Sequence, residues 1–227
     1  MHRIAVSLMV ACVARAGFAQ SPLRPAAATR VVTTAPSRTL AQPSPHTLSP
    51  ALRIEAAVSP APVALRAGAT VLDYDSTGKL VTVRPGTNPL ICLADNPVQK
   101  SFHVACYDRE LEPFMARGRA LRAQHVSSDE TDSIRAREIR SGTLAMPRHP
   151  TALYQYVASR DSVDGADGVI HGAMYLYLAY IPFATTASTG FPAEPLTNGG
   201  PWLMYPGKPW AHLMIGPPQP ATITLGK

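Results

Sequence analysis

The sequence predicts an α+β fold, a single domain with one mostly antiparallel β-sheet and an inserted pair of helices. Short runs rich in β-branched and aromatic residues occur between residues 69 and 94 and again after residue 151, as expected for strands. Between these groups, residues 108–124 and 127–142 have the apolar and charged spacing of helices. Because strands and helices are grouped and do not alternate, the pattern favours α+β over a parallel α/β sheet.

The first 52 residues are expected to lie outside this domain. Residues 1–19 combine a basic start, a short apolar run and small residues ahead of the bond after Ala19, which is typical of a cleaved secretory signal peptide. A lipoprotein signal ending at Cys12 is the alternative. Residues 20–52 are rich in Pro, Ala, Ser and Thr, and we expect a disordered linker there. Residues 53–227 then form the α+β globular domain.

The predicted signal peptide makes the protein periplasmic or secreted. No later segment is long and apolar enough to span a bilayer, so we expect no stable membrane insertion. The net charge of +6 arises mostly from five Arg residues that precede residue 53, where no acidic residue occurs. The remaining basic and acidic residues nearly balance, and a near-neutral domain is a poor candidate for binding nucleic acid.

The first strands are expected in a β-hairpin. Residues 69–74 and 79–84 are β-rich runs on either side of Asp75-Ser76-Thr77-Gly78, a composition typical of hairpin turns. Residues 90–94, LICLA, are a short apolar run that is expected to add a third strand to the same sheet. The segment that follows, with the second cysteine, is expected to be a loop.

The two predicted helices differ in their apolar content. Residues 108–124 place several large apolar side chains on one face. Asp108 is suited to capping this helix, and the proline after Glu112 suggests that regular helix begins near there. Residues 127–142 have Ser128 as the expected cap, acidic residues early and arginines late. Their few apolar residues predict a short, largely solvated helix.

Five further strands are expected after residue 151. Each is a short run rich in Tyr, Ile, Leu or Met, and proline and glycine clusters separate the runs. In the second run, alternation puts Tyr175 and Tyr177 on one face of the sheet and Leu176 and Leu178 on the other. The five runs are TALYQYVASR, HGAMYLYLAYIP, WLMYPG, AHLMIGP and ATITLG.

Cys92 and Cys106 are the two cysteines that remain after signal cleavage. An even number of cysteines in an exported protein predicts a disulfide. The bond would close a loop of about 15 residues, for which the chain-entropy model gives about 3 kcal/mol of stabilisation. Metal or redox chemistry is less favoured, because the spacing is not C-x-x-C and only His103 lies nearby. We expect no metal and no cofactor.

Candidate binding residues fall in two segments. The disulfide is expected to hold the RPGTN segment at the end of the hairpin close to the start of the first helix. The segment GGPWLMYPGKPWAHLMI contains both tryptophans, whose rings would stack on a sugar or an apolar ligand if exposed and would otherwise pack in the core. The candidates are Arg84, Asn88, Asp108, Trp202, Tyr205, Trp210 and His212.

Two functional hypotheses are compatible with this sequence. The leading one is a non-enzymatic domain that binds a small molecule or a component of the cell envelope. The alternative is a hydrolase or metal-assisted enzyme using His103, His171 or His212 with Asp108 or Asp167. His171 and His212 each begin a strand-like run, so they are expected at one end of the sheet. The usual serine-hydrolase and P-loop motifs are missing from the sequence.

Two patterns resemble a family of uncharacterised exported bacterial proteins. The first is R-x-G-T-N at 84–88, followed by Cys92 and by C-x-D at 106–108, and the second is G-P-W…P-G-x-P…A-H-L-M-I near the C-terminus. The patterns cover about half of the domain. The sequence departs from the family at Leu90, where the family has an aromatic residue. The resemblance implies export and the same fold, and it implies no particular activity.

Overall fold

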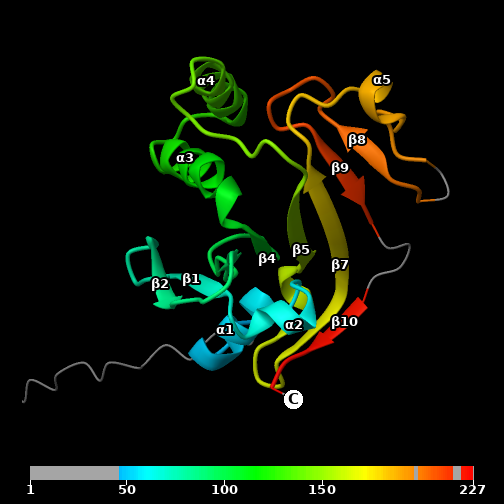
Figure 1. Ribbon diagram of the computed structural model, residues 1–227. Helices are drawn as coiled ribbons and strands as arrows, with labels where there is room; N and C mark the ends of the chain where they lie inside the picture. Colours follow the sequence, from blue (N-terminus) through cyan, green and yellow to red (C-terminus); the bar gives the residue numbers. More distant parts are fainter. Residues whose placement is uncertain (1–45, 197–198, 217–220, 227) are drawn as a thin grey trace, which may run out of the picture. The chain divides into compact units, whose positions relative to one another are not determined.

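The structure, a computed structural model, describes residues 46–196, 199–216 and 221–226 (Figure 1). The predicted signal peptide and residues 20–45 of the predicted linker lie outside this range. In chain order the elements are α1 (Pro50–Val58), α2 (Val63–Arg66), β1 (Thr70–Tyr74), β2 (Leu80–Arg84), β3 (Leu90–Leu93), β4 (Ser101–Asp108), the 3-10 helix η1 (Arg109–Leu111), α3 (Glu112–Ala123), α4 (Ser128–Arg140), β5 (Thr151–Ser159), the 3-10 helix η2 (Arg160–Ser162), β6 (Val163–Asp164), β7 (Val169–Tyr180), α5 (Thr186–Thr189), β8 (Trp202–Met204), β9 (His212–Ile215) and β10 (Ala221–Thr224).

The α+β fold is confirmed. The strands form one mixed sheet in the order β2-β1-β3-β4-β5-β7-β9-β8, and β6 and β10 also pair with β7. All of these pairs are antiparallel except β1 with β3, which is parallel. The long strands β4, β5 and β7 form the centre of the sheet (Figure 1). The predicted helix pair, α3 and α4, is inserted between β4 and β5.

The predicted hairpin is confirmed as β1 and β2. In its turn the Asp75 carboxylate accepts hydrogen bonds from the N–H groups of Thr77 (2.9 Å) and Lys79 (3.0 Å). Gly78 supplies a positive φ of 79°, which a residue without a Cβ adopts at little cost. The run at residues 90–94 is also a strand, but the following cysteine segment is not a loop. It forms β4, whose residues 105–108 pair with β3.

The folded part of the chain begins earlier than Arg53. Ser49 caps α1 by accepting from the N–H of Leu52, and Pro50 occupies the first turn, where its missing N–H has no cost. Leu48 is only 6 % exposed and belongs to the hydrophobic core. Residues 46–52, which composition alone assigned to the linker, are therefore part of the fold.

The two faces of the sheet carry different helices. Tyr107 of β4 and Leu178 of β7 pack with Phe114 of α3 on one face. Because side chains alternate along a strand, the even-numbered residues of β4 point to the other face. There Phe102 and Val104 pack with α1. The predicted alternation in β7 is confirmed, since Tyr175 and Tyr177 stack with tyrosines of β5 on the α1 side and Leu178 lies in the α3 core.

The helix pair is largely as predicted. α3 begins at Glu112, and Asp108 caps the short 3-10 turn before it by accepting from the N–H of Glu110 (3.0 Å). α4 is capped by Ser127, not by Ser128. Its apolar contact is small, as expected, with Ala136 as its buried apolar residue. Within the described residues, no helix is long and apolar enough to cross a membrane.

Candidate functional site

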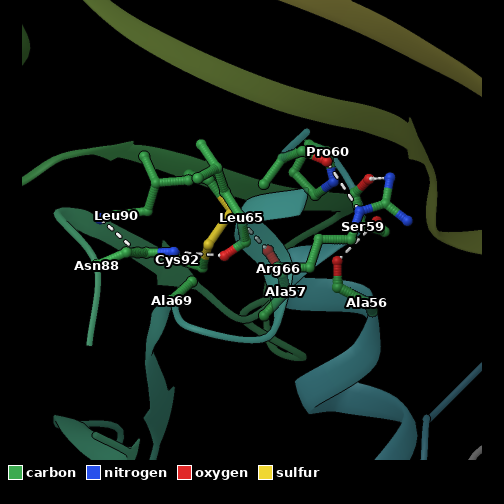
Figure 2. Close-up of a disulfide and its surroundings, with 12 residues drawn as sticks. Ala56, Ala57, Ser59, Pro60, Leu65, Arg66, Ala69, Asn88, Leu90 and Cys92 are labelled. Carbon is green, nitrogen blue, oxygen red and sulfur yellow. Dashed lines mark hydrogen bonds between the residues drawn. A yellow bond between two sulfur atoms is a disulfide. The ribbon is translucent and has the colours of Figure 1, made fainter. Parts of the chain in front are cut away.

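The disulfide between Cys92 and Cys106 is confirmed (Figure 2). The two residues are directly opposite each other in the β3–β4 pair, and both are fully buried. The bond lies under α1 and α2, in a core that includes Ala57 and Leu65. It therefore joins two strands in the interior, and within the described residues neither cysteine has a thiol that could act as a nucleophile or metal ligand.

The side chains of Arg84 and Asn88 form hydrogen bonds with backbone groups in the region of this bond. The Arg84 guanidinium donates to the carbonyls of Arg66 (2.7 Å) and Ala69 (3.1 Å). The Asn88 amide donates to Leu65 O (2.6 Å), and its oxygen accepts from the N–H of Leu90 (2.9 Å; Figure 2). We call Arg84, Asn88, Cys92 and Cys106 the disulfide corner. Its polar side chains satisfy backbone groups of the chain, and their role in binding stays a prediction.

A glycine in the RPGTN segment has a steric reason. A Cβ at Gly86 would lie 2.2 Å from the backbone nitrogen of Thr70 and 2.6 Å from the carbonyl carbon of Ala69. Real Cβ atoms do not approach backbone this closely, so the segment closes onto the start of β1 only with glycine here. The motif residues at 84–88 thus all help to hold the α2–β1 connection.

The C-terminal candidates belong mainly to the core. Trp210 is buried and stacks on Phe114 with ring centroids 6.3 Å apart. His212 is buried too, its Nδ1 lies 2.8 Å from Trp210 O, and burial lowers its pKa. Tyr205 is 48 % exposed and Trp202 is half-buried against the α3 core. The structure thus brings these four near one another without forming a shared aromatic platform at the surface.

The histidines of the enzyme hypothesis do not meet. His212 pairs with Tyr180 at the end of β7, whereas His171 lies near the start of the same strand. The expectation that both lie at one end of the sheet is wrong, because β7 and β9 are antiparallel and pair only near the end of β7. His103 Nε2 lies 2.9 Å from Gln155 Oε1. Within the described part of the chain, no three His, Cys, Asp or Glu side chains are grouped to hold a metal ion.

A wide groove of about 910 Å³ lies between the β1–β2 hairpin, the β3–β4 connection and α3. Its floor is the α3-side face of β1, β3 and β4, and the exposed face of α3 forms one side. We call it the α3 groove. The residues that define it are Leu72, Tyr74, Lys79, Leu93, Asp95, Asn96, Gln99, Ser101, His103, Ala105, Glu112, Arg119 and Arg122.

One wall of the α3 groove is held by buried charges. The Asp95 carboxylate, which is 5 % exposed, accepts from Arg160 (Nη1–Oδ2 2.6 Å, Nη2–Oδ1 3.0 Å) and from the N–H of His103 (2.9 Å). Arg53 donates to Asp95 O (3.0 Å) and forms a bidentate pair with the buried Asp73. Bidentate charge-assisted hydrogen bonds fix geometry strongly, so this network positions the wall before any ligand arrives.

The Arg160 side chain also donates hydrogen bonds to backbone carbonyls of this wall. Its Nη2 donates to the carbonyls of Ser101 (2.8 Å), Asn96 (3.1 Å) and Gln99 (3.3 Å). A single guanidinium from the end of β5 therefore orders the whole β3–β4 connection. The side chains of this connection are consequently presented to the groove from a rigid backbone.

The opposite side of the groove carries positive charge. Arg119 pairs with Glu112, and both contact the Tyr107 hydroxyl. The side chain of Arg122 is exposed and forms no hydrogen bond or ion pair with any described residue. Partial desolvation lowers its pKa, and the nearby charges of Arg135 and Arg119 act in the same direction. Burial raises the pKa of Tyr74, while Arg119 and Arg122 act in the opposite direction. These cations at the groove create a positive potential.

Among the residues that line this groove, sequence reasoning named His103, as a candidate of the enzyme hypothesis, and missed the others. Asp95 and Arg160 are 65 positions apart and carry no motif, and Arg122 is one of several arginines on a helix. Comparisons with models of protein families, with curated proteins and with solved structures give no match for this chain. The site therefore rests on its own geometry and charge.

Proposed function

We propose that this protein is an exported, non-enzymatic binding protein for small anionic molecules, with the α3 groove as its binding site. The observation that carries the proposal is the unpaired Arg122 guanidinium beside a groove whose opposite wall is fixed by the buried Asp95–Arg160 network. A preorganised wall lowers the ordering cost of binding. An unpaired guanidinium offers bidentate hydrogen bonds to carboxylate or phosphate.

The charge balance of the groove supports an anion. Glu112 is matched by Arg119, and Asp95 is matched by Arg160. Among the groove residues in the described part of the chain, Arg122 and Lys79 have no ion pair. The charged side chains that line the groove therefore leave an excess of positive charge, which attracts ligands of the opposite sign. The groove thus favours a ligand with at least one negative group.

The remaining lining suggests the other properties of the ligand. Asn96, Gln99 and Ser101 offer amide and hydroxyl groups, and Leu72 and Leu93 add apolar surface. A volume of about 910 Å³ is in the range of pockets that hold small molecules. We therefore propose a small polycarboxylate or phosphorylated metabolite as ligand, and a periplasmic or secreted location, to which the Cys92–Cys106 disulfide is suited.

Calorimetric titration with citrate, and with glucose as a neutral probe of similar size, tests this proposal. Citrate should bind, and it should stabilise the protein by about 2.7 kcal/mol at one hundred times its Kd. Arg122→Gln should weaken citrate binding by at least about tenfold, since a hydrogen bond to a charged group is worth about 1.5–3 kcal/mol.

The matched control is Arg109→Gln, which removes an exposed arginine that lines none of the described cavities. It should leave citrate binding unchanged. Equal binding of citrate and glucose would contradict the proposal, and so would equal effects of the two arginine substitutions.

A further inference from the structure

Two adjacent cavities share one exposed aromatic side chain, Phe183. The first cavity, of about 570 Å³, is lined by α4 and the β8–β9 turn, and the second, of about 580 Å³, is lined by the α4–β5 connection and the end of β7. Phe183 is 51 % exposed and lines both cavities. Phe183 therefore forms part of the wall of both cavities.

Phe183 is held in an unfavourable backbone conformation. Its φ is +64°, a region that costs a side-chain-bearing residue about 1–2 kcal/mol. Its N–H donates to Lys208 O (2.9 Å), and the N–H of Gly207 donates to Ala184 O (2.7 Å). These two bonds join the β7–α5 loop to the β8–β9 turn. Strain maintained in this way on an exposed aromatic residue indicates a functional position.

The first cavity is cationic. Arg137 and Arg140 lie three residues apart on one face of α4, and Lys208 comes from the facing turn. Within the described residues, none of these three side chains forms a hydrogen bond or ion pair. The one carboxylate that lines this cavity, Asp132, is paired with Arg135.

The second cavity combines a large apolar lining with two basic residues, Arg148 and His149. Its lining includes Ile139, Leu144, Met146 and Ile181, all buried or half-buried, together with three prolines. Leu144 and Met146 also border the main core. An apolar surface of this kind is suited to a hydrocarbon chain, which gains about 0.8 kcal/mol for each buried CH₂ group.

We propose that these two cavities form a second site, which binds an anionic amphiphile such as a fatty acid. The carboxylate contacts Arg137, Arg140 and Lys208, and the chain passes Phe183 into the apolar cavity. The charges of the first cavity and the apolar lining of the second match the two ends of such a molecule. This site is separate from the α3 groove and does not depend on its proposed function.

Decanoate below its micelle concentration is the probe, with tryptophan fluorescence as one readout because Trp210 lines the cationic cavity. Trp202→Phe leaves Trp210 as the single tryptophan of the chain, and calorimetry provides a second readout. Decanoate should bind saturably. Butyrate, which has the charge without the chain, and decyl maltoside, which has the chain without the charge, should each bind at least about tenfold more weakly.

Substitutions separate this site from the α3 groove. Arg140→Gln with Lys208→Gln should weaken decanoate binding about tenfold, and Arg122→Gln should leave it unchanged. Both substituted side chains are exposed, so the fold should persist, and the melting temperature verifies this. If the double variant does not fold, Arg137→Gln alone is expected to weaken binding in the same direction.

Phe183→Gly tests the shared wall. Glycine tolerates the positive φ, so the melting temperature should not fall, while decanoate binding should weaken because the ring is lost. The proposal is overturned if decanoate does not bind, if decyl maltoside binds equally well, or if Arg122→Gln has the same effect as the double variant.

Discussion

The disulfide corner and the α3 groove each contain an arginine, and the two guanidinium groups differ in their partners. In the disulfide corner, the Arg84 guanidinium donates to the carbonyls of Arg66 and Ala69. At the α3 groove, the Arg122 guanidinium has no such partner among the described residues, and partial desolvation with neighbouring arginines lowers its pKa. Residue type and position in the sequence do not distinguish the role of Arg84 from that of Arg122. The partners do, and the unmatched charge of Arg122 beside the groove is the basis of the proposed binding site.

The two regions also differ in how they are stabilised. The disulfide corner is held by a covalent bond and by hydrogen bonds to nearby backbone. The wall of the α3 groove is held by buried ion pairs between residues that are far apart in the sequence. Removing one member of a buried ion pair leaves the other charge uncompensated, which is more costly than losing a neutral contact. The following substitutions test this difference, from the largest expected effect to the smallest.

Arg160→Ala is expected to have the largest effect. It leaves the Asp95 carboxylate buried without its guanidinium, and it frees three backbone carbonyls of the wall. We expect a loss of about 3–5 kcal/mol in the free energy of unfolding, measured by denaturation in urea. The control is Arg117→Ala, which breaks a partly exposed pair with Glu138 and should cost less than about 1 kcal/mol. Equal losses would show that the network does not hold the wall.

Removal of the disulfide comes next. Cys92→Ala with Cys106→Ala should lower the free energy of unfolding by about 3 kcal/mol, the chain-entropy value for a loop of about this length. Guanidinium denaturation with and without reductant measures the effect. Reductant should shift the wild-type midpoint to lower denaturant and leave the double variant unchanged. A wild-type midpoint that does not move under reducing conditions would contradict the stabilising role of this bond.

The contrast between these regions also explains what the sequence could predict. The structure confirms the features that have a local signal in the sequence. These are the cysteine pair, predicted from an even number of cysteines, the hairpin, predicted from its turn, and the helix pair, predicted from its spacing. The Asp95–Arg160 pair joins segments 65 residues apart, and such a contact has no periodicity to detect. The helix from Pro50 was hidden by a proline-rich context, although Ser49-Pro50 is itself a helix-start signal. Unmatched charge, which identifies the groove, is visible only after all partners are placed.

Asn88→Ala tests the disulfide corner without changing a charge. It removes the bond to Leu65 O and leaves the N–H of Leu90 without an acceptor, so we expect a loss of about 1–3 kcal/mol. Asn96→Ala is the control, because the Asn96 side chain accepts an exposed bond of 3.2 Å from the N–H of Val98 and bonds the hydroxyl of Tyr74, and neither partner is a backbone group of the core. Thermal unfolding should show a smaller change for this variant. The prediction is wrong if both asparagine variants melt at the same temperature.

The pH dependence of stability should come in part from the core on the α3 side of the sheet, which His212 adjoins, and not from the disulfide corner, which contains no histidine and no carboxylate. Burial lowers the pKa of His212 in the folded protein. Below the unfolded pKa of about 6.5, the unfolded chain then binds a proton that the folded chain does not. The free energy of unfolding consequently falls as the pH falls from about 6.5 toward the folded pKa.

His212→Phe should reduce this slope by at most one proton, about 1.4 kcal/mol per pH unit. Urea denaturation of both proteins between pH 5 and 8 measures it. Near pH 8 the imidazole is neutral in both states, so the two slopes should coincide there, which serves as the internal control. A variant whose slope below pH 6.5 equals that of the wild type would show that His212 takes up its proton equally well in the folded protein, and that its burial next to Trp210 does not resist the charge.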